Sequence, residues 1–205
     1  MLQQSSKNNS ISPQTESKTM NITDASIVDN KLASAALEIA RSQVGQLEYP
    51  IGSNRGEMVD KYLASVGLNP GYAWCQAFVY WCYERAARQS CRENPVVRTA
   101  GVWDCWNRCA NSAKDGQAVA VRLPKEEVVG NSQVLQAGDQ FIMIFRNHTG
   151  HTGLVERVAF TADGVPILHT IEGNSNADGS REGYAVVRRQ RKLSDSTIKG
   201  FIRYV

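Results

Sequence analysis

Apolar residues in the first half of the chain recur at helical spacing. The clearest stripe starts at Cys75, where positions i, i+3, i+4, i+7 and i+11 are Cys75, Phe78, Val79, Cys82 and Ala86. Pro70 and Gly71 precede this stripe, and no helix breaker follows it until about Ser90. The pattern predicts a buried helix whose first turn carries Cys75.

Three further helices are predicted from the same spacing. Their apolar stripes occupy residues 31–45, 57–66 and 101–113. Residues 1–30 differ, because they are rich in Ser, Asn, Gln, Thr and Lys and contain few large apolar side chains. Such a segment cannot bury enough apolar surface to offset the entropy lost on ordering. We therefore expect a disordered or loosely attached extension at 1–30 and a folded domain at 31–205.

The pattern changes from helical to strand-like after Gly138. Short β-rich runs separated by turn residues lie at 140–146, 151–160, 167–172, 184–190 and 200–205. Residues 115–137 are less regular and contain one short apolar run, which predicts a loop with a brief strand. Strands joined by turn-length links favour an antiparallel sheet. The expected fold class is α+β, with N-terminal helices packed on one face of a C-terminal antiparallel sheet of about five strands.

Composition adds few constraints. The 205 residues carry a formal net charge of +3, which gives no support to nucleic-acid binding. We interpret the one basic cluster as the solvated end of a strand; its members are Arg188, Arg189, Arg191 and Lys192. No stretch approaches the roughly 20 apolar residues of a membrane span, and the first residues lack the apolar segment of a secretory signal. We expect a protein without a membrane span that is made in the cytoplasm without an export signal.

The chain has five cysteines, an odd number, and no CxxC pair. Cys82, Cys105 and Cys109 are interpreted as core residues, because no further ligand completes a zinc set. Cys75 differs, since free backbone N–H groups at a helix start favour the thiolate, which is the nucleophilic form. Most unpaired cysteines are nevertheless small buried hydrophobes. The helix alone therefore leaves both interpretations of Cys75 open.

A thiol nucleophile needs a base within hydrogen-bond reach and a third polar group that orients the base. Of the three histidines, His148 lies in a predicted turn and His169 lies mid-strand, at an odd spacing from Glu172 that puts the two on opposite sheet faces. His151 opens a strand directly after a turn, so its ring can reach a cleft at the sheet end. The next strand would bring Glu172 close to His151, with Asn174 as a second possible orienting group.

Glu172 taken singly has an ordinary interpretation as an exposed carboxylate at a strand end. The joint pattern favours chemistry, because a cysteine at a helix start, a histidine at a strand start and an acid at the end of the next strand occur together. This arrangement predicts a Cys75–His151–Glu172 triad.

Four short motifs occur in an order that resembles a known family. They are Trp-Cys-Gln-Ala-Phe-Val at 74–79, Ala-Gly-Asp at 137–139, Gly-His-Thr-Gly-Leu-Val at 150–155 and Ile-Glu-Gly-Asn at 171–174. In this order they resemble the motifs of CHAP domains, which are cysteine, histidine-dependent amidohydrolases or peptidases related to NlpC-type and papain-like hydrolases. The resemblance extends over roughly residues 32–205.

The resemblance implies a papain-like fold and a peptidoglycan hydrolase that cleaves an amide bond. The enzyme would be an N-acetylmuramoyl-L-alanine amidase or a stem-peptide or cross-bridge endopeptidase. Cys75 matches the nucleophile, His151 the base and Glu172 the residue that orients it. The implied substrate-binding or orienting positions are Asn174, Asn54, Trp74 and Gln76.

Some members of this family carry an acidic calcium loop before the cysteine, whereas this chain has Asn69, Pro70, Gly71 and Tyr72 there. We therefore expect no metal or cofactor. The expected partners are peptidoglycan and an immunity or inhibitor protein. Without an export signal, the enzyme would reach the cell wall after lysis, as a phage lysin does, or through a dedicated secretion apparatus, as an interbacterial toxin does.

Two other function classes fit the same residues. One is a thiol hydrolase of the same fold that acts on another amide, such as a γ-glutamyl or polyamine conjugate. The other is a non-catalytic binding module that keeps the fold, and an intact set of Cys75, His151 and Glu172 argues against it.

Overall fold

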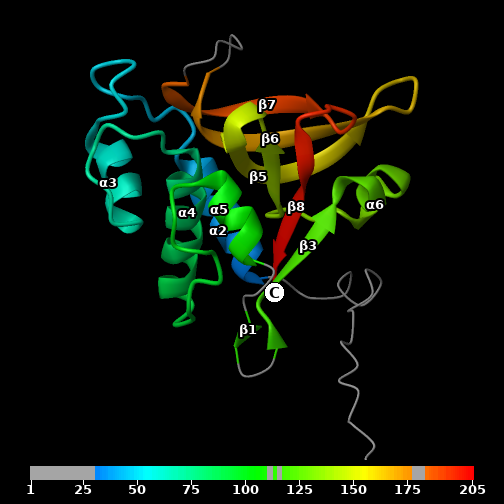
Figure 1. Ribbon diagram of the computed structural model, residues 1–205, viewed down its shortest axis with the longest axis horizontal. Coiled ribbons are helices and arrows are strands. Elements are labelled where there is room, and N and C mark those ends of the chain that lie inside the picture. The colour runs from blue at the N-terminus through cyan, green and yellow to red at the C-terminus, as the bar shows by residue number, and fades with distance from the viewer. Residues whose placement is uncertain (1–30, 110–112, 115–116, 177–182) are drawn as a thin grey trace, which may run out of the picture.

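The computed structural model describes residues 31–109, 113–114, 117–176 and 183–205. The predicted extension at 1–30 lies outside these ranges, and so does part of the segment after the fourth predicted helix. The remaining chain confirms the α+β class, with helices first and an antiparallel sheet after them (Figure 1).

All four predicted helices are present. They are α2 (Lys31–Ser42), α3 (Glu57–Ser65), α4 (Cys75–Gln89) and α5 (Val102–Cys109). Helix α4 is buried over most of its length, and α2 and α3 pack against it. The predicted core cysteines Cys82, Cys105 and Cys109 have no exposed surface. Helical periodicity was sufficient to find these elements because each buries an apolar stripe in the same core cluster.

The sheet has six strands, in the order β3-β8-β4-β5-β6-β7, and every neighbouring pair is antiparallel. The strands are β3 (Ala120–Pro124), β4 (Gln140–Ile144), β5 (Gly150–Phe160), β6 (Pro166–Ser175), β7 (Ala185–Lys192) and β8 (Ile198–Tyr204). The predicted count of about five was one short, because the brief strand predicted within 115–137 is β3, which pairs with β8 at the edge of the sheet.

A short hairpin of β1 (Ala113–Lys114) and β2 (Gln117–Ala118) precedes β3. Helix α6 (Lys125–Gly130) and two 3₁₀ turns, η1 (Ser132–Val134) and η2 (Arg146–His148), complete the described elements. None of these was predicted as a separate element. They are too short for a hydrophobic period to be recognised.

The four predicted helices lie on one side of the sheet, as expected, and the unpredicted α6 lies on the other. Helices α2 to α5 gather on one side, whereas α6 lies at the other side of the molecule, against β3 and β8 (Figure 1). Alternate residues of β4 therefore face different cores: Ile142 packs with the helices, and Phe141 packs with the second cluster that includes Val128 of α6. The larger core holds α4 against β5 and β6, the two strands that carry the predicted base and acid.

Candidate active site

Helix α4 places Cys75 at its first residue, and the Cys75 side chain lines a cleft. The first hydrogen bond of the helix runs from the Phe78 N–H to the Trp74 carbonyl, at 2.8 Å. The N–H of Cys75 precedes that bond and is one of the orphan donors of the helix start. The residue is 5% exposed, so the sulfur is embedded in the protein and reaches solvent only through the cleft.

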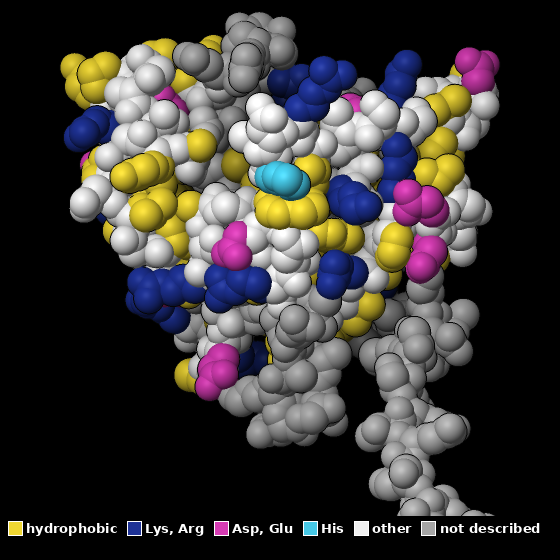
Figure 2. All heavy atoms as spheres, viewed as in Figure 1, with side chains coloured by type: hydrophobic (Ala, Val, Ile, Leu, Met, Phe, Trp, Pro, Cys, Tyr) yellow, Lys and Arg dark blue, Asp and Glu magenta, His cyan; other side chains and the backbone are white. Residues whose placement is uncertain are grey.

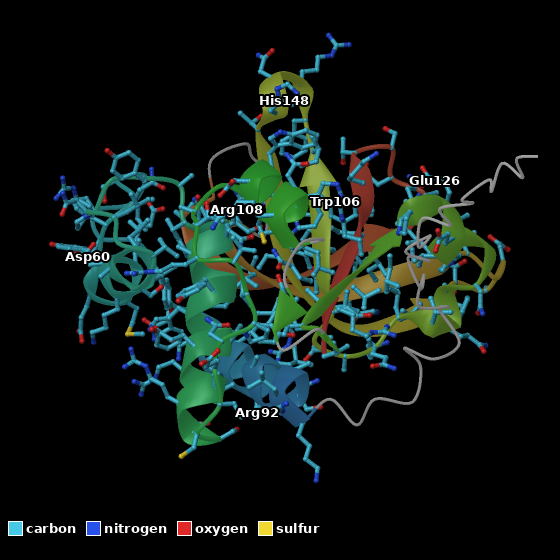
Figure 3. The ribbon with its side chains drawn as sticks, turned by 60° about the horizontal axis from the view of Figure 1, so that its bottom comes forward. Asp60, Arg92, Trp106, Arg108, Glu126 and His148 are labelled. Carbon is cyan, nitrogen blue, oxygen red and sulfur yellow. The ribbon has the colours of Figure 1, made fainter. Side chains whose placement is uncertain are left out.

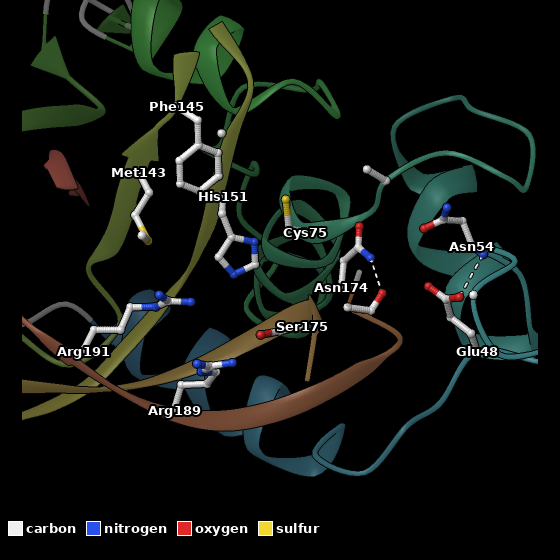
Figure 4. A pocket seen from close by; sticks show the side chains of 14 residues that line it. Glu48, Asn54, Cys75, Met143, Phe145, His151, Asn174, Ser175, Arg189 and Arg191 are labelled. Atoms are coloured by element: carbon white, nitrogen blue, oxygen red, sulfur yellow. Dashed lines mark hydrogen bonds between the residues drawn. The ribbon is translucent and has the colours of Figure 1, made fainter. Parts of the chain in front are cut away.

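His151, at the start of β5, lies between Cys75 and Glu172. Its Nε2 is 2.7 Å from Oε2 of Glu172, and its other ring nitrogen faces the cysteine (Figure 4). Burial alone would lower the pKa of His151, but hydrogen bonds to Cys75 and Glu172 outweigh burial and raise the pKa to about 9. At neutral pH the imidazole therefore holds its proton between two groups that stabilise the positive charge.

Glu172, on β6, has no exposed surface and accepts five hydrogen bonds. The donors are His151, Thr170, Ser175 and two nitrogens of Arg191. Burial favours the neutral acid, but the bonds from His151 and Arg191 outweigh burial and hold the pKa of Glu172 well below its usual range. Glu172 is thus a permanently charged acceptor that fixes the orientation of the imidazole.

Arg191 corrects the interpretation of the basic cluster. Its Nε and Nη2 each lie 2.6 Å from a different oxygen of Glu172, and its side chain is only 14% exposed. The alternation of β7 was the missed signal, because Arg189 and Arg191 lie on one face of the strand and Arg188 lies on the other. The first two line the cleft, while Arg188 is exposed and pairs with Glu156.

Two glycines provide the space that this arrangement requires. Leu154 pairs with Ile171, which puts Gly153 beside Glu172. A Cβ on Gly153 would lie 2.9 Å from Cγ of Glu172 and 2.5 Å from the Ile171 carbonyl oxygen. A Cβ on Gly173 would lie 2.7 Å from the Phe78 side chain. The glycines of the two motifs therefore let the acid extend toward the histidine and let β6 approach α4.

Asn174 connects the end of β6 to the start of α4. Its Oδ1 accepts the backbone N–H of Trp74 at 2.9 Å, and its Nδ2 donates to the Gly183 carbonyl at 2.6 Å. The backbone of Asn174 is left-handed, with φ of 52°, a conformation that asparagine tolerates better than most residues. Asn174 lines the cleft and holds the residue before Cys75 in place.

Glu48 is a site residue that was not predicted. It accepts the Trp74 Nε1–H at 2.8 Å and the backbone N–H of Asn54 at 2.9 Å, and both Glu48 and Asn54 line the cleft. No pattern marks Glu48, because it is a single acid in an irregular loop. Its contacts with Trp74 and Asn54 place it at the site.

Trp74 and Gln76 have no exposed surface, so neither side chain can contact a substrate. Trp74 stacks on Tyr62 with ring centroids 5.5 Å apart, and Gln76 accepts a hydrogen bond from Gln140 at 2.7 Å. Of the two predicted roles, burial argues against substrate binding by either side chain. An orienting role, exerted through the backbone on either side of Cys75, stays a prediction.

The other two histidines lie away from the cleft. His148 is at the tip of the β4–β5 connection (Figure 3) and is exposed, with its ring 4.9 Å from that of Trp103. His169 is on the face of β6 opposite to Glu172, as the odd spacing predicted; its neighbours are Arg157 and Glu156. His151 is the histidine that reaches Cys75.

The cleft has a volume of about 520 Å³. Exposed apolar side chains stand beside it on the loops before α3 and α4, including Tyr49, Ile51 and Tyr72, which are 82%, 58% and 57% exposed. In Figure 2, hydrophobic side chains gather at the upper left, over the loop that precedes α3, and the basic side chains described on this face are dispersed. These exposed apolar residues are therefore neighbours in sequence of the cleft-lining residues Glu48, Gly52 and Ala73.

Comparisons with known proteins bear on the family. The CHAP domain family model matches residues 67–174, more than half of the 205-residue chain. The chain belongs to the CHAP domain family. The part of the chain that matches the CHAP domain contains Cys75, His151 and Glu172 and ends at Asn174.

One solved structure is similar to this CHAP protein, the crystal structure of a wild-type endolysin, LysIME-EF1. The two share 16% sequence identity with a TM-score of 0.47, and the match covers 84% of this chain and 63% of that one. The chain thus spans less than two thirds of the endolysin's length. The comparison with curated proteins found no match.

The described residues contain no group of three or more His, Cys, Asp or Glu side chains arranged to hold a metal ion. Within the same ranges, no helix has the length and apolar character needed to cross a membrane.

Proposed function

We propose that this CHAP protein is a peptidoglycan hydrolase that cleaves an amide bond with Cys75 as nucleophile. Family membership supports hydrolysis of peptidoglycan in general. The observation that carries the cysteine mechanism is the position of His151, which hydrogen-bonds to the Cys75 thiol on one side and to the Glu172 carboxylate on the other.

In this mechanism the Cys75 thiolate attacks the carbonyl carbon of the scissile amide, and the carbonyl oxygen becomes an oxyanion. The backbone N–H of Cys75, at the positive end of α4, is suited to stabilise that charge. The His151 imidazolium then donates its proton to the leaving nitrogen, and the C–N bond breaks to give a thioester and a free amine.

The second half of the reaction uses the same residues. Neutral His151 takes a proton from water as the water oxygen attacks the thioester, and the C–S bond breaks to release the acid and the thiolate. Glu172 accepts from the same histidine throughout, and Arg191 keeps Glu172 charged. These two residues therefore support a cycle in which the imidazole gains and loses a proton in one fixed orientation.

Digestion of purified sacculi tests this function. Wild type and Cys75→Ala would be compared, and the released fragments analysed by mass spectrometry. Cys91→Ala is the matched control, because Cys91 is an exposed cysteine just beyond the same helix. We expect release by wild type and Cys91→Ala and none by Cys75→Ala.

The new amine and carboxyl ends would identify the cleaved bond. They would distinguish an N-acetylmuramoyl-L-alanine amidase from an endopeptidase. Equal release by Cys75→Ala would show that the nucleophile is wrongly assigned. No release by folded wild type would point to another amide, such as a γ-glutamyl or polyamine conjugate.

A further inference from the structure

Glu48 is a buried carboxylate whose charge is balanced by no cation in the described part of the chain. It is 2% exposed, and its hydrogen bonds come from an indole N–H and a backbone N–H, both neutral. Each oxygen uses one acceptor position and keeps another. A buried charge normally has an ionic partner, because desolvation is costly. Glu48 lines the cleft, so a cation bound there would supply that partner.

On the other side of the cleft, Arg189 is a cation without a carboxylate partner among the described residues. Its Nη1 donates to the Asn176 carbonyl, and no ion pair of Arg189 occurs among the described residues. Its neighbours on β7 differ in this respect, since Arg188 pairs with Glu156 and Arg191 with Glu172. A guanidinium has five N–H donors in a plane that matches a carboxylate. Arg189 lines the cleft and retains donors for such a group.

The two residues lie on opposite sides of the nucleophile. Figure 4 shows Glu48 to one side of Cys75 and Arg189 to the other, all three around the same cleft. We infer that the cleft binds a peptide with an ammonium group on the Glu48 side and a carboxylate on the Arg189 side of the bond presented to Cys75.

This inference rests on the proposed function and specifies its substrate class. Stem peptides of peptidoglycan carry free carboxylates, and they carry ammonium groups at a free amino end or on a diamino acid side chain. The bond between the glycan and the stem peptide has only the neutral lactyl group on its glycan side. The charge pattern of the cleft therefore favours cleavage within the stem peptide or cross-bridge over cleavage of the N-acetylmuramoyl-L-alanine bond.

Binding to the Cys75→Ala variant tests the inference without requiring turnover. The probes are the tripeptide L-alanyl-γ-D-glutamyl-L-lysine, the same peptide with both amines acetylated, and the same peptide with its carboxylates amidated. Calorimetry would give the affinity of each. We expect acetylation and amidation each to weaken binding about tenfold or more, as the loss of a charged hydrogen bond predicts.

Substitutions then assign each preference to one residue. In the Cys75→Ala background, Glu48→Gln should abolish the sensitivity to acetylation and leave the sensitivity to amidation. Arg189→Gln should do the reverse. Glu57→Gln and Arg188→Gln are matched controls, because both residues are exposed and pair with other surface residues. Both controls should keep the two sensitivities of the parent.

Several outcomes would overturn the inference. If Glu48→Gln weakened binding of free and acetylated peptide equally, Glu48 would serve only to hold Trp74 and the 48–54 loop. Equal binding of all three peptides, or binding of none, would likewise contradict it. A failure of the proposed function is distinguishable, since it would appear in the sacculus digestion, as release that does not depend on Cys75 or as no release by folded wild type, whatever the peptide affinities.

Discussion

Two buried carboxylates in this protein are each bound by an arginine from a neighbouring strand, yet their surroundings differ. Glu172 on β6 is bound by Arg191 of β7 through two bonds of 2.6 Å. Asp139, just before β4, is bound by Arg203 of β8 through bonds of 2.9 and 2.6 Å. Both acids belong to motifs that suggested the CHAP family.

The difference lies in the third partner. Asp139 accepts the backbone N–H of Gln136, which closes the turn before β4, and Arg203 has no exposed surface. Glu172 instead meets His151, which continues to Cys75, and it lies beside the cleft. A buried carboxylate–arginine pair therefore says little about function by itself. The histidine and the access to solvent make one pair part of a site and leave the other in the core.

The largest expected effect separates the two acids by activity. Glu172→Gln removes the charge that orients and stabilises the His151 imidazolium, so we expect hydrolysis to fall roughly 10³- to 10⁴-fold. Asp139→Asn should leave the rate per folded molecule unchanged. The measurement is the initial rate of sacculus solubilisation, normalised to the folded fraction from circular dichroism. An equal loss of activity in both variants would show that Glu172 and Asp139 do not differ in their effect on hydrolysis.

The next effect concerns stability. Asp139→Ala leaves the Arg203 guanidinium buried without its carboxylate, which should cost about 3–5 kcal/mol of the free energy of unfolding. Urea denaturation measures it. Replacing Asp139 and Arg203 together by apolar residues should recover much of this loss, because no unpaired charge remains. A cost below about 1 kcal/mol for Asp139→Ala would mean that water or rearrangement satisfies Arg203.

The third prediction is a pH-dependent contribution of His151 to the free energy of unfolding. The pKa of His151 is raised from 6.5 to about 9, so the folded protein keeps a proton that the unfolded chain releases. The resulting stabilisation is fully present below pH 6.5 and is lost as the pH rises through about 9. The free energies of unfolding of wild type and His151→Gln, measured below pH 6.5 and above about pH 9, would give the size of this stabilisation. A difference between the two proteins that stays constant across the window would contradict this assignment.

The smallest effect is expected at an exposed pair on the same strand as Arg191. Arg188 and Glu156 are 3.2 Å apart, with Arg188 53% exposed. Arg188→Gln should change the free energy of unfolding by about 0–1 kcal/mol. Arg191→Gln should cost clearly more in the same urea assay, because it leaves Glu172 buried with fewer donors. Similar costs for the two variants would show that the greater burial of Arg191 does not increase its contribution to stability.

Much of the site was predictable because its signals are local. A helix start is marked by Pro70 and Gly71, and the turn before His151 is marked by glycine and asparagine. Each signal depends on neighbours a few residues away. Arg191 was misinterpreted as solvated because a run of basic residues normally faces water. Trp74 and Gln76 were predicted to bind or orient the substrate, and their side chains are buried. In each case the outcome depended on which face of an element meets another element.

The sequence by itself determined helices α2 to α5, five of the six described strands of the sheet, the α+β class and the identity of the three residues that meet at the site. Hydrophobic periodicity and turn residues specify these features, since they reflect contacts within one element or between adjacent strands. Only the tertiary structure decided that β3 pairs with β8 at the edge of the sheet, that Arg191 binds Glu172, and that Glu48 and Arg189 line the cleft on opposite sides of Cys75. The first and last of these arrangements join segments that are far apart in the sequence, and the contact of Arg191 with Glu172 depends on which face of β7 is buried, so no local pattern specifies them.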